Sequence, residues 1–563
     1  MNAAIEGFRA KAQAAMEAGN AAEAASLLGN AANAQPADAE LWNSAAGASL
    51  RAGNPEEAVE RYMRARALAP KSVDFAVNHA IALGRVGRHR TALAALAECE
   101  DEGVRDARYC STRANAARNA GLHGEAARWY DHVLALDPDH PRARHGRARV
   151  ALERAEPDAL ARFEHALTLD PGNPESWLGK AQALDVAGQA MEAKMIAQAL
   201  ADRAPNWTEA LRFLAQLLLA EGDEDFAAPY ATAAMRSPDD PAIPIAHCAV
   251  LAALDRSAEA AEVAAEARLR FPNMARLAML EASHAGEAGD DRRAEAIWAS
   301  LKHQTGERAL HEARHRLRVG QPDRAESLLA SHLEDDAGSV AGWALRGLAW
   351  RMLDDPRHEW LHAQEGLVQF LPLRGADNLL ARATSELHRI HDGSALPLGQ
   401  SLRGGTQTRG GLFDRYEPIW SELEAAVFAS LADYREKLAA EDREHPLLRH
   451  RDARWTFAGS WSVRLAGGGD HHTSHIHPQG IVSSALYLDL PEDIEGEGKV
   501  GWLEIGRPPA DLRLDLPPIH TIQPREGYLA LFPSTLYHGT TPFAGSHRLT
   551  MAFDVQAAEE VAS

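Results

Sequence analysis

The sequence predicts a two-part protein: an all-α solenoid of helical hairpins over residues 1–390, followed by a double-stranded β-helix, or jelly roll, over residues 396–558. Three observations lead to this fold class. Prolines recur through the first part at intervals of 33 or 34 residues, or twice that. The helical periodicity then stops at Gly393. Short segments rich in Val, Ile, Trp, Tyr and Phe follow, each bounded by turn-forming residues.

Composition and charge restrict the partners of this chain. Of its 563 residues, 46% are hydrophobic and 25% are charged, which is typical of an ordinary folded protein. The 80 acidic residues outnumber the 59 Lys and Arg, so the formal net charge is -21. Because such a surface repels phosphate groups and anionic lipids, we expect neither nucleic acid nor a membrane as a partner.

The cysteines and the N-terminus favour a cytoplasmic location. Cys99, Cys110 and Cys248 are too few and too irregularly spaced for a disulfide framework or a zinc site. The N-terminal segment carries acidic residues and no continuous apolar core, so no signal peptide is expected. The sequence contains no run of about 18 apolar residues, so no transmembrane helix is expected.

Each repeat of the first part consists of two amphipathic, alanine-rich helices separated by a glycine and followed by a proline. The second repeat shows the pattern most clearly. Small residues allow paired helices to approach, and aromatic residues fill the space between successive pairs. In this repeat the large residues are Trp42 and Tyr62, the small ones are Ala46, Ala58 and Ala65, and the turn is marked by Pro70.

Two later segments repeat this order, with Tyr130 before Pro138 and Phe163 before Pro171. With these residues the first part resembles the tetratricopeptide-repeat family. The resemblance implies a curved solenoid whose concave face binds a protein or peptide, or alternatively a plain scaffold or dimerisation arm. No residue within the repeats points to catalysis.

One helix and five strands are expected in the second part. The helix extends from Tyr416 to about Glu441. Short strands separated by regular turns are typical of a compact β-sandwich or barrel of the jelly-roll kind. The predicted strands cover residues 454–465, 481–490, 499–505, 528–532 and 548–555.

Histidines gather in this second part. His475 and His477 are separated by one residue, so on a strand both side chains point to the same face. His538 follows after further strands. Imidazole is a suitable ligand for Fe(II), and three protein ligands leave coordination positions open. Arg548 lies ten residues after His538, with Thr550 two residues further, and a guanidinium group can bind a carboxylate through two hydrogen bonds.

These segments together resemble the 2-oxoglutarate- and Fe(II)-dependent dioxygenases, in particular the prolyl-hydroxylase-like branch. The resemblance covers about residues 396–558 and rests on the motifs HIHP, SSALYLDLP, LFPSTLYHGTTPF and RLTMAFDV. It implies a complete set of ligands. The residues implied to hold Fe(II) are His475, His477 and His538, and those implied to hold 2-oxoglutarate are Arg548, Thr550 and Tyr487.

The resemblance also implies an activity. O₂ and 2-oxoglutarate are consumed, succinate and CO₂ are released, and a C–H bond is hydroxylated in a protein or peptide that the repeats recruit. Two other functions remain open. One is a catalytically inactive scaffold for protein–protein interaction, and the other is a three-histidine dioxygenase that does not use 2-oxoglutarate.

One position departs from the family pattern. His477 stands where the family has Asp or Glu, and three neutral imidazoles leave the charge of the metal ion uncompensated. The third ligand is therefore His477, or a carboxylate from Asp470 or Glu504, or this coordination position is open. His472 is expected to line the mouth of the site and Trp461 to pack in the core.

Overall fold

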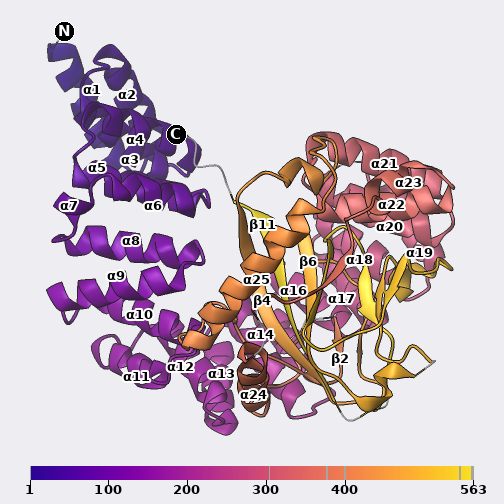
Figure 1. Cartoon of the computed structure of the whole chain (residues 1–563). Coiled ribbons are helices and arrows are strands. Elements are labelled where there is room, and N and C mark those ends of the chain that lie inside the picture. Colours follow the sequence, from indigo (N-terminus) through magenta and orange to yellow (C-terminus); the bar gives the residue numbers. More distant parts are fainter. Residues whose placement is uncertain are drawn as a thin grey trace. The chain divides into compact units, whose positions relative to one another are not determined.

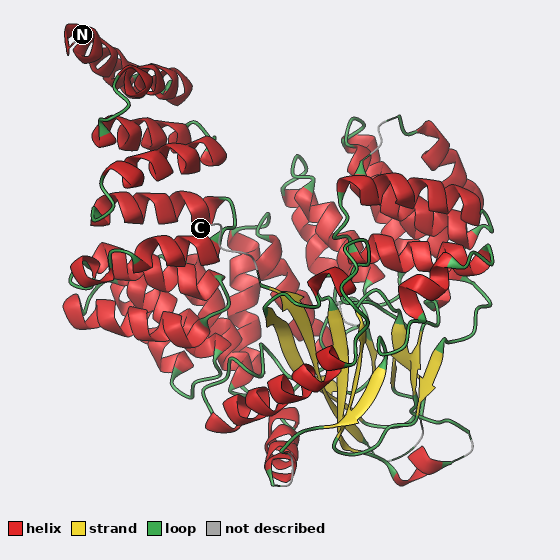
Figure 2. Ribbon diagram, turned by 45° about the horizontal axis from the view of Figure 1, so that its top comes forward, coloured by secondary structure: helices red, strands yellow, loops and turns green. Residues whose placement is uncertain are grey.

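The computed structural model describes residues 2–302, 305–375, 378–398, 401–496, 498–543, 545 and 547–558. The chain divides into two compact units, the first ending at Lys180 and the second comprising Ala181–Ala558 (Figure 1). The described residues confirm the predicted fold class: helical repeats are followed by the antiparallel sheets of a jelly roll (Figure 2).

Antiparallel helix pairs build the first unit. Their apolar faces form internal cores of alanine, leucine and aromatic side chains, so each pair is stabilised by its neighbours. The helices are α1 (Asn2–Glu17), α2 (Ala21–Ala34), α3 (Ala39–Arg51), α4 (Pro55–Leu68), α5 (Val73–Arg85), α6 (His89–Ala97), α7 (Glu100–Gly103), α8 (Ala107–Asn119), α9 (His123–Leu136), α10 (Pro141–Glu153), α11 (Ala159–Leu169) and α12 (Pro174–Val186), which contains the division between the units.

Glycine closes several of these helix pairs because the residue at the turn adopts a left-handed backbone conformation. Gly53, Gly87 and Gly121 have φ angles of 81°, 77° and 74°. A Cβ atom is strained in this region, which explains the recurrence of glycine in the sequence. Ala155 and Asp255 hold equivalent turns at φ 53° and 60° without glycine.

Close contact between successive repeats requires a second kind of glycine. A Cβ atom on Gly146 would lie 2.3 Å from the Tyr130 ring, and one on Gly179 would lie 2.2 Å from the Phe163 ring. Each aromatic ring therefore packs directly against the backbone of the next repeat. This is the large-against-small packing that the spacing of the repeats predicts.

The second unit continues the repeats and adds two helices that cover the sheet. None of the helices in the described part of the chain has the length and apolarity needed to cross a lipid bilayer. Its helices are α13 (Ala190–Arg203), α14 (Thr208–Ala220), α15 (Ala228–Arg236), α16 (Ala242–Ala252), α17 (Ser257–Arg270), α18 (Ala275–Glu287), α19 (Asp291–Ser300), α20 (Gly306–Arg318), α21 (Pro322–Asp335), α22 (Val340–Met352), α23 (Arg357–His362), α24 (Leu379–His391) and α25 (Pro418–Glu436).

Three antiparallel sheets form the β part of this unit. The main sheet has the order β1-β9-β6-β11-β4-β3, a second sheet has the order β10-β7-β8, and β2 pairs with β5. Strand β1 precedes residue 390, so the main sheet also uses residues before the predicted β domain. The strands are β1 (Gln369–Pro372), β2 (Leu402–Arg403), β3 (Thr406–Gln407), β4 (Trp455–Leu465), β5 (His471–His472), β6 (Val482–Asp489), β7 (Leu503–Ile505), β8 (His520–Ile522), β9 (Tyr528–Pro533), β10 (His538–Thr540) and β11 (Arg548–Ala557), with 3₁₀ turns η1 (Leu448–His450), η2 (Glu492–Glu495) and η3 (Ala510–Leu512).

Successive side chains of strand β11 point alternately to the two faces of the main sheet. One face packs under α24 and α25 in the largest core of the unit, and α25 crosses this face in Figure 1. The opposite face lines a cavity. A strand buried on both sides in this way positions polar side chains at the cavity with little freedom. Leu549, Met551, Phe553 and Val555 lie on the core face, and Arg548, Thr550, Ala552 and Asp554 lie on the cavity face.

Helices α20 and α22 of the repeats share a hydrophobic core with the β part. That core includes Leu345 from α22, Leu512 from η3 and Tyr537 from the segment before β10. Asp511 accepts hydrogen bonds from two arginines of α20, at 2.6 Å from Arg314 and 3.1 Å from Arg318. These repeats are therefore a structural part of the second unit.

Candidate metal centre

A cavity of about 540 Å³ lies between the cavity face of the main sheet and the three-stranded sheet. Side chains of β4 and β11 form one wall, and residues of β7 and β10 form the other. The predicted site residues His475, His477, His538, Arg548 and Thr550 all line this cavity.

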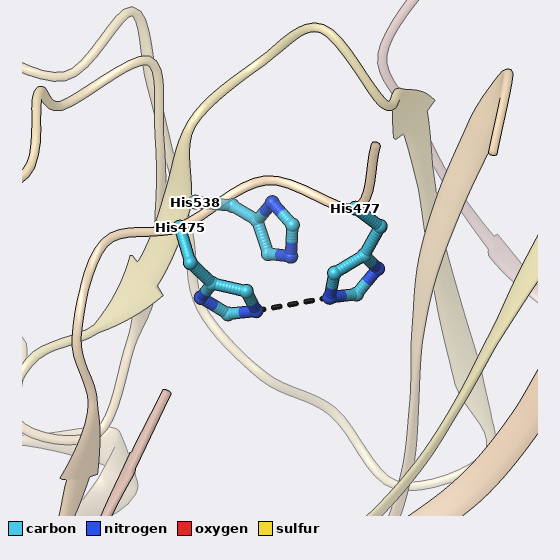
Figure 3. Close-up of side chains that lie close together, drawn as sticks. All are labelled: His475, His477 and His538. Carbon is cyan, nitrogen blue, oxygen red and sulfur yellow. Dashed lines mark hydrogen bonds between the residues drawn. The ribbon is translucent and has the colours of Figure 1, made fainter. Parts of the chain in front are cut away.

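The three histidines come together although they lie on two separate segments. An isolated antiparallel bridge pairs His475 with His538, so the backbone itself fixes this contact. The ring centroids of His475 and His538 are 4.4 Å apart, and that of His477 lies 4.9 Å from each. Figure 3 shows the three rings pointing toward one another.

Each of these histidines uses its Nδ1 atom in a hydrogen bond outside the cluster. His475 Nδ1 donates to the carbonyl oxygen of Thr473 at 2.8 Å, and His538 Nδ1 donates to that of Leu536 at 3.2 Å. His477 Nδ1 donates to a carboxylate oxygen of Asp554 at 2.7 Å. Since carbonyl and carboxylate oxygens only accept, the proton of each neutral ring is on Nδ1, and Nε2 carries a lone pair.

Burial keeps His475 and His538 neutral. Desolvation, reinforced by His477, lowers the pKa of His475 to about 3. Desolvation also places the pKa of His538, and that of the neighbouring His472, well below the ordinary value. Neutral imidazole is the form that binds metal ions, so these rings are ready to act as ligands at neutral pH.

The donor geometry fits a divalent metal ion. His475 Nε2 and His477 Nε2 lie 3.0 Å apart, the contact that Figure 3 marks with a dashed line. Without a metal ion, one of these nitrogens donates a hydrogen bond to the other, and a divalent cation would replace that proton. The ligand atoms of all three histidines are within 4.8 Å of one another. Three imidazoles with open positions suit Fe(II) among other first-row metals.

The two alternative carboxylates have other partners. Asp470 accepts a hydrogen bond from the backbone N–H of Ala466 at 2.8 Å. Glu504 is paired with Arg507, and its neighbours Leu503 and Ile505 point into the core between the sheets, so Glu504 points the other way. The structure therefore brings neither residue into the histidine cluster.

Arg548 is a buried cation at the cavity wall. Its guanidinium carbon lies 5.4 Å from the centre of the Tyr487 ring, and Thr550 pairs with Tyr487 across neighbouring strands. Within the described residues no carboxylate forms an ion pair with Arg548, and its Nε atom and the Tyr487 hydroxyl are buried without a hydrogen bond. Burial raises the pKa of Tyr487 to about 12, so its hydroxyl keeps its proton and can donate. An unpaired buried guanidinium indicates that an anion binds here.

Two residues of the site were missed or misjudged from the sequence. Asp554 is 7% exposed and binds His477, and Ser483 donates a second hydrogen bond to it at 2.9 Å. Its position inside RLTMAFDV, six residues after Arg548 on one strand, was the available signal. Trp461 packs against a small core, as expected, but it also lines the cavity, and its ring centre lies 5.1 Å from that of His477.

Helices α20 and α22 of the repeats pack against the segments that carry the candidate metal ligands. Ile476 lies between His475 and His477 in the chain, and Tyr537 directly precedes His538. Both pack into the core that α20 and α22 form with the β part. Because alternate residues of an extended segment point in opposite directions, this packing directs the histidines into the cavity.

Comparisons with known families agree with this architecture. Residues 459–554 match the family described as "Putative 2OG-Fe(II) oxygenase", and residues 151–217 match the tetratricopeptide-repeat family. The protein is thus a helical-repeat protein with a jelly roll. More specifically, its jelly roll matches the family described as "Putative 2OG-Fe(II) oxygenase" and its helices match the tetratricopeptide-repeat family, as the resemblance predicted. The oxygenase family implies Fe(II) and 2-oxoglutarate, and tetratricopeptide repeats generally mediate protein–protein interactions.

Solved structures similar to this chain are helical-repeat proteins. A tetratricopeptide repeat protein from Parabacteroides merdae is 18% identical, with a TM-score of 0.38 over 43% of this chain and 97% of its own. PilF of Pseudomonas aeruginosa is 18% identical, with a TM-score of 0.33 over 38% and 98%. MamA of Desulfovibrio magneticus is 17% identical, with a TM-score of 0.29 over 30% and 97%. These scores carry no functional argument. No curated protein matches the chain.

Proposed function

We propose that the second unit is a 2-oxoglutarate- and Fe(II)-dependent oxygenase that hydroxylates a protein or peptide. One observation carries the proposal: a single cavity contains three imidazoles whose ligand atoms lie close together and a buried, unpaired arginine. The imidazoles suit a divalent metal ion, and the arginine suits an anion. A molecule of 2-oxoglutarate satisfies both, because one end chelates a metal and the other is a carboxylate.

The residues have separate roles in this proposal. His475, His477 and His538 hold Fe(II), which supplies the activation of O₂ when it is bound. Arg548 binds the distal carboxylate of 2-oxoglutarate, and the hydroxyl groups of Thr550 and Tyr487 complete that pocket. In the overall reaction, one atom of O₂ enters the new carboxylate of succinate, CO₂ leaves, and the other atom becomes the hydroxyl of the substrate.

Asp554 provides the negative charge that an Asp or Glu ligand brings in the family pattern. Its carboxylate accepts the Nδ1 proton of His477, which fixes the ring orientation and raises the basicity of Nε2. The third ligand in our proposal is therefore His477 with Asp554 behind it, in preference to Asp470 or Glu504.

A protein or peptide partner is proposed for the repeats of the first unit. The repeats α20 and α22 of the second unit already pack on the β part, so their surfaces there are not available. We keep the cytoplasmic location as a prediction; Cys99, Cys110 and Cys248 are buried free thiols.

The test is an anaerobic titration of the full chain with Fe(II) and then 2-oxoglutarate. We expect the visible charge-transfer band of a chelated keto acid. His538→Ala should abolish the band, and Arg548→Gln should require at least tenfold more 2-oxoglutarate because one charged contact is lost. Lys499→Gln, a surface change outside the cavity, is the matched control and should leave the titration unchanged.

Other results would support the alternatives. The absence of the band in folded, iron-loaded protein would overturn the proposal and favour a three-histidine dioxygenase. A band without succinate formation, across many candidate peptides, would favour a scaffold. Asp554→Asn retains a hydrogen-bond acceptor without the charge, so it should weaken Fe(II) binding by about 10-fold or more while the fold is kept.

A further inference from the structure

A second cluster of potential metal ligands lies outside the cavity, in the same unit. It consists of His388 near the end of α24, Asp489 at the end of β6 and His547 immediately before β11. Their ligand atoms lie within 4.8 Å of one another. None of the three residues lines the 540 Å³ cavity.

One carboxylate oxygen is the centre of this cluster. Asp489 Oδ2 lies 2.9 Å from His388 Nε2 and 2.7 Å from His547 Nε2. The two rings meet edge to face, with centroids 5.2 Å apart and an interplanar angle of 89°. Both imidazoles therefore direct the same atom, Nε2, to one point, although they come from a helix and from a strand entry.

The strand register supports this convergence. Asp489 pairs with Leu549 across β6 and β11, so His547, two residues before Leu549, lies on the same face of the sheet. This is the face covered by α24, whose Leu387 packs in the same core as Leu549. His388 follows Leu387 directly and thus reaches the edge of that packed face. The backbone positions of all three ligands are fixed by the fold.

We propose that His388, Asp489 and His547 form a second metal site, which binds Zn²⁺ or a similar divalent transition metal ion. Two imidazole nitrogens and one carboxylate oxygen are a common zinc ligand set, and a water molecule completes a tetrahedron. Ligand atoms of such a site lie about 3.3 Å apart, so the two nitrogen–oxygen separations need to widen by only about 0.5 Å. This proposal does not depend on the function proposed for the cavity.

Binding at this site joins three elements. It links α24 to the end of β6 and to the residue that precedes Arg548. The bound ion therefore stabilises the start of β11, where the proposed carboxylate-binding residue lies. Because the ligands are about one-third exposed and none of them lines the cavity, the proposed role is structural.

The test uses untagged, full-length protein in which the cavity histidines are replaced by His475→Ala and His538→Ala. Zn²⁺ or Co²⁺ is added, and bound metal is measured by equilibrium dialysis with elemental analysis. We expect one equivalent of metal, an absorption spectrum of tetrahedral Co²⁺, and a higher melting temperature with Zn²⁺.

The matched variants add His388→Gln or His547→Gln to this background. Glutamine still donates a hydrogen bond to Asp489, so the fold should be retained, as circular dichroism can check. Each change should weaken metal binding by at least 10-fold. Two results would overturn the proposal: no bound metal in the folded starting protein, or an equivalent whose affinity and Co²⁺ spectrum are unchanged in both variants.

Discussion

The same helical repeat plays different structural roles in the two units of this protein. In the first unit, each helix pair packs on pairs that are near in sequence. In the second unit, α20 and α22 also pack on residues far along the chain, among them Ile476 and Tyr537, which are direct neighbours of the candidate metal ligands. The comparison teaches that a repeat, although its own fold depends on local spacing, can also support a site formed by residues far away in the sequence. This requires that the repeat's outer surface is apolar and fits the surface of the β part.

One ion pair from each unit illustrates the difference between a buried and an exposed charge. Asp511 accepts from Arg314 and Arg318, and the Arg318 side chain is 1% exposed. In the first unit, Asp74 pairs with Arg108 at 3.3 Å, and its side chain is 79% exposed. A buried cation depends on its partner, whereas an exposed pair is screened by water.

The largest expected effect comes from a matched pair of core substitutions, Leu345→Ala in the second unit and Leu83→Ala in the first. Both side chains are at most 3% exposed, so each change should cost about 3 kcal/mol of unfolding free energy. Only Leu345→Ala should also weaken Fe(II) binding, because Leu345 packs in the core that contains Tyr537 and Ile476. Equal metal affinity in both variants would contradict the structural role of the repeats.

A slightly smaller effect on the free energy of unfolding is expected from the pair Asp511→Asn in the second unit and Asp74→Asn in the first. The first change leaves the buried Arg318 without its counter-charge and should cost about 2–3 kcal/mol. The second should cost less than about 1 kcal/mol, because the pair is exposed. Urea denaturation followed by circular dichroism measures both. Similar losses in the two variants would show that Asp511 is not a buried ion-pair centre.

The next effect is a dependence of the second unit's stability on pH. Burial lowers the pKa of His362 to about 3 and that of His391 to about 3 in the second unit. In the unfolded chain these rings titrate near 6.5, so their stability contribution is complete above that pH and is lost as the pH falls toward 3. Each should cost about 1.4 kcal/mol at pH 5.5. His362→Gln should reduce the difference in unfolding free energy between pH 7.5 and 5.5 by about this amount.

The smallest effect concerns two turns that lack glycine. Ala155→Gly in the first unit should stabilise it by about 0.5–1 kcal/mol, because it relieves a left-handed alanine. Asp255→Gly in the second unit relieves similar strain but loses the ion pair with Arg403 at 2.7 Å, so its net effect should be near zero. Melting temperatures compare the two, and a clear gain for Asp255→Gly would mean that the Arg403 contact contributes nothing.

Much of the fold followed from local patterns. The predicted strands at 454–465, 481–490 and 548–555 differ from β4, β6 and β11 by no more than two residues at either end. Strands such as β2, β5 and β10 were not predicted, because two or three residues are too few to show alternation. They form by pairing with other short segments, β2 with β5 and β10 with β7.

The candidate site shows the same limit. The spacing of His475, His477, His538 and Arg548 was sufficient to propose a metal ion beside an anion, and the structure lines one cavity with all four. Asp554 was overlooked, since it lies 77 residues from His477 and meets it only through the register of β11. The cluster of His388, Asp489 and His547 was also not foreseen, because its members come from three separate elements.

The sequence by itself determined the repeats, the order of the two parts and the identity of the histidines and arginine. These features depend on neighbours within a few turns or strand positions, where chain geometry leaves few alternatives. Only the tertiary structure decided which carboxylate supports His477, which helices support the metal-binding segments and which ligands meet outside the cavity. Such contacts join residues tens to hundreds of positions apart, and they arise from strand register and helix packing, which no local pattern specifies.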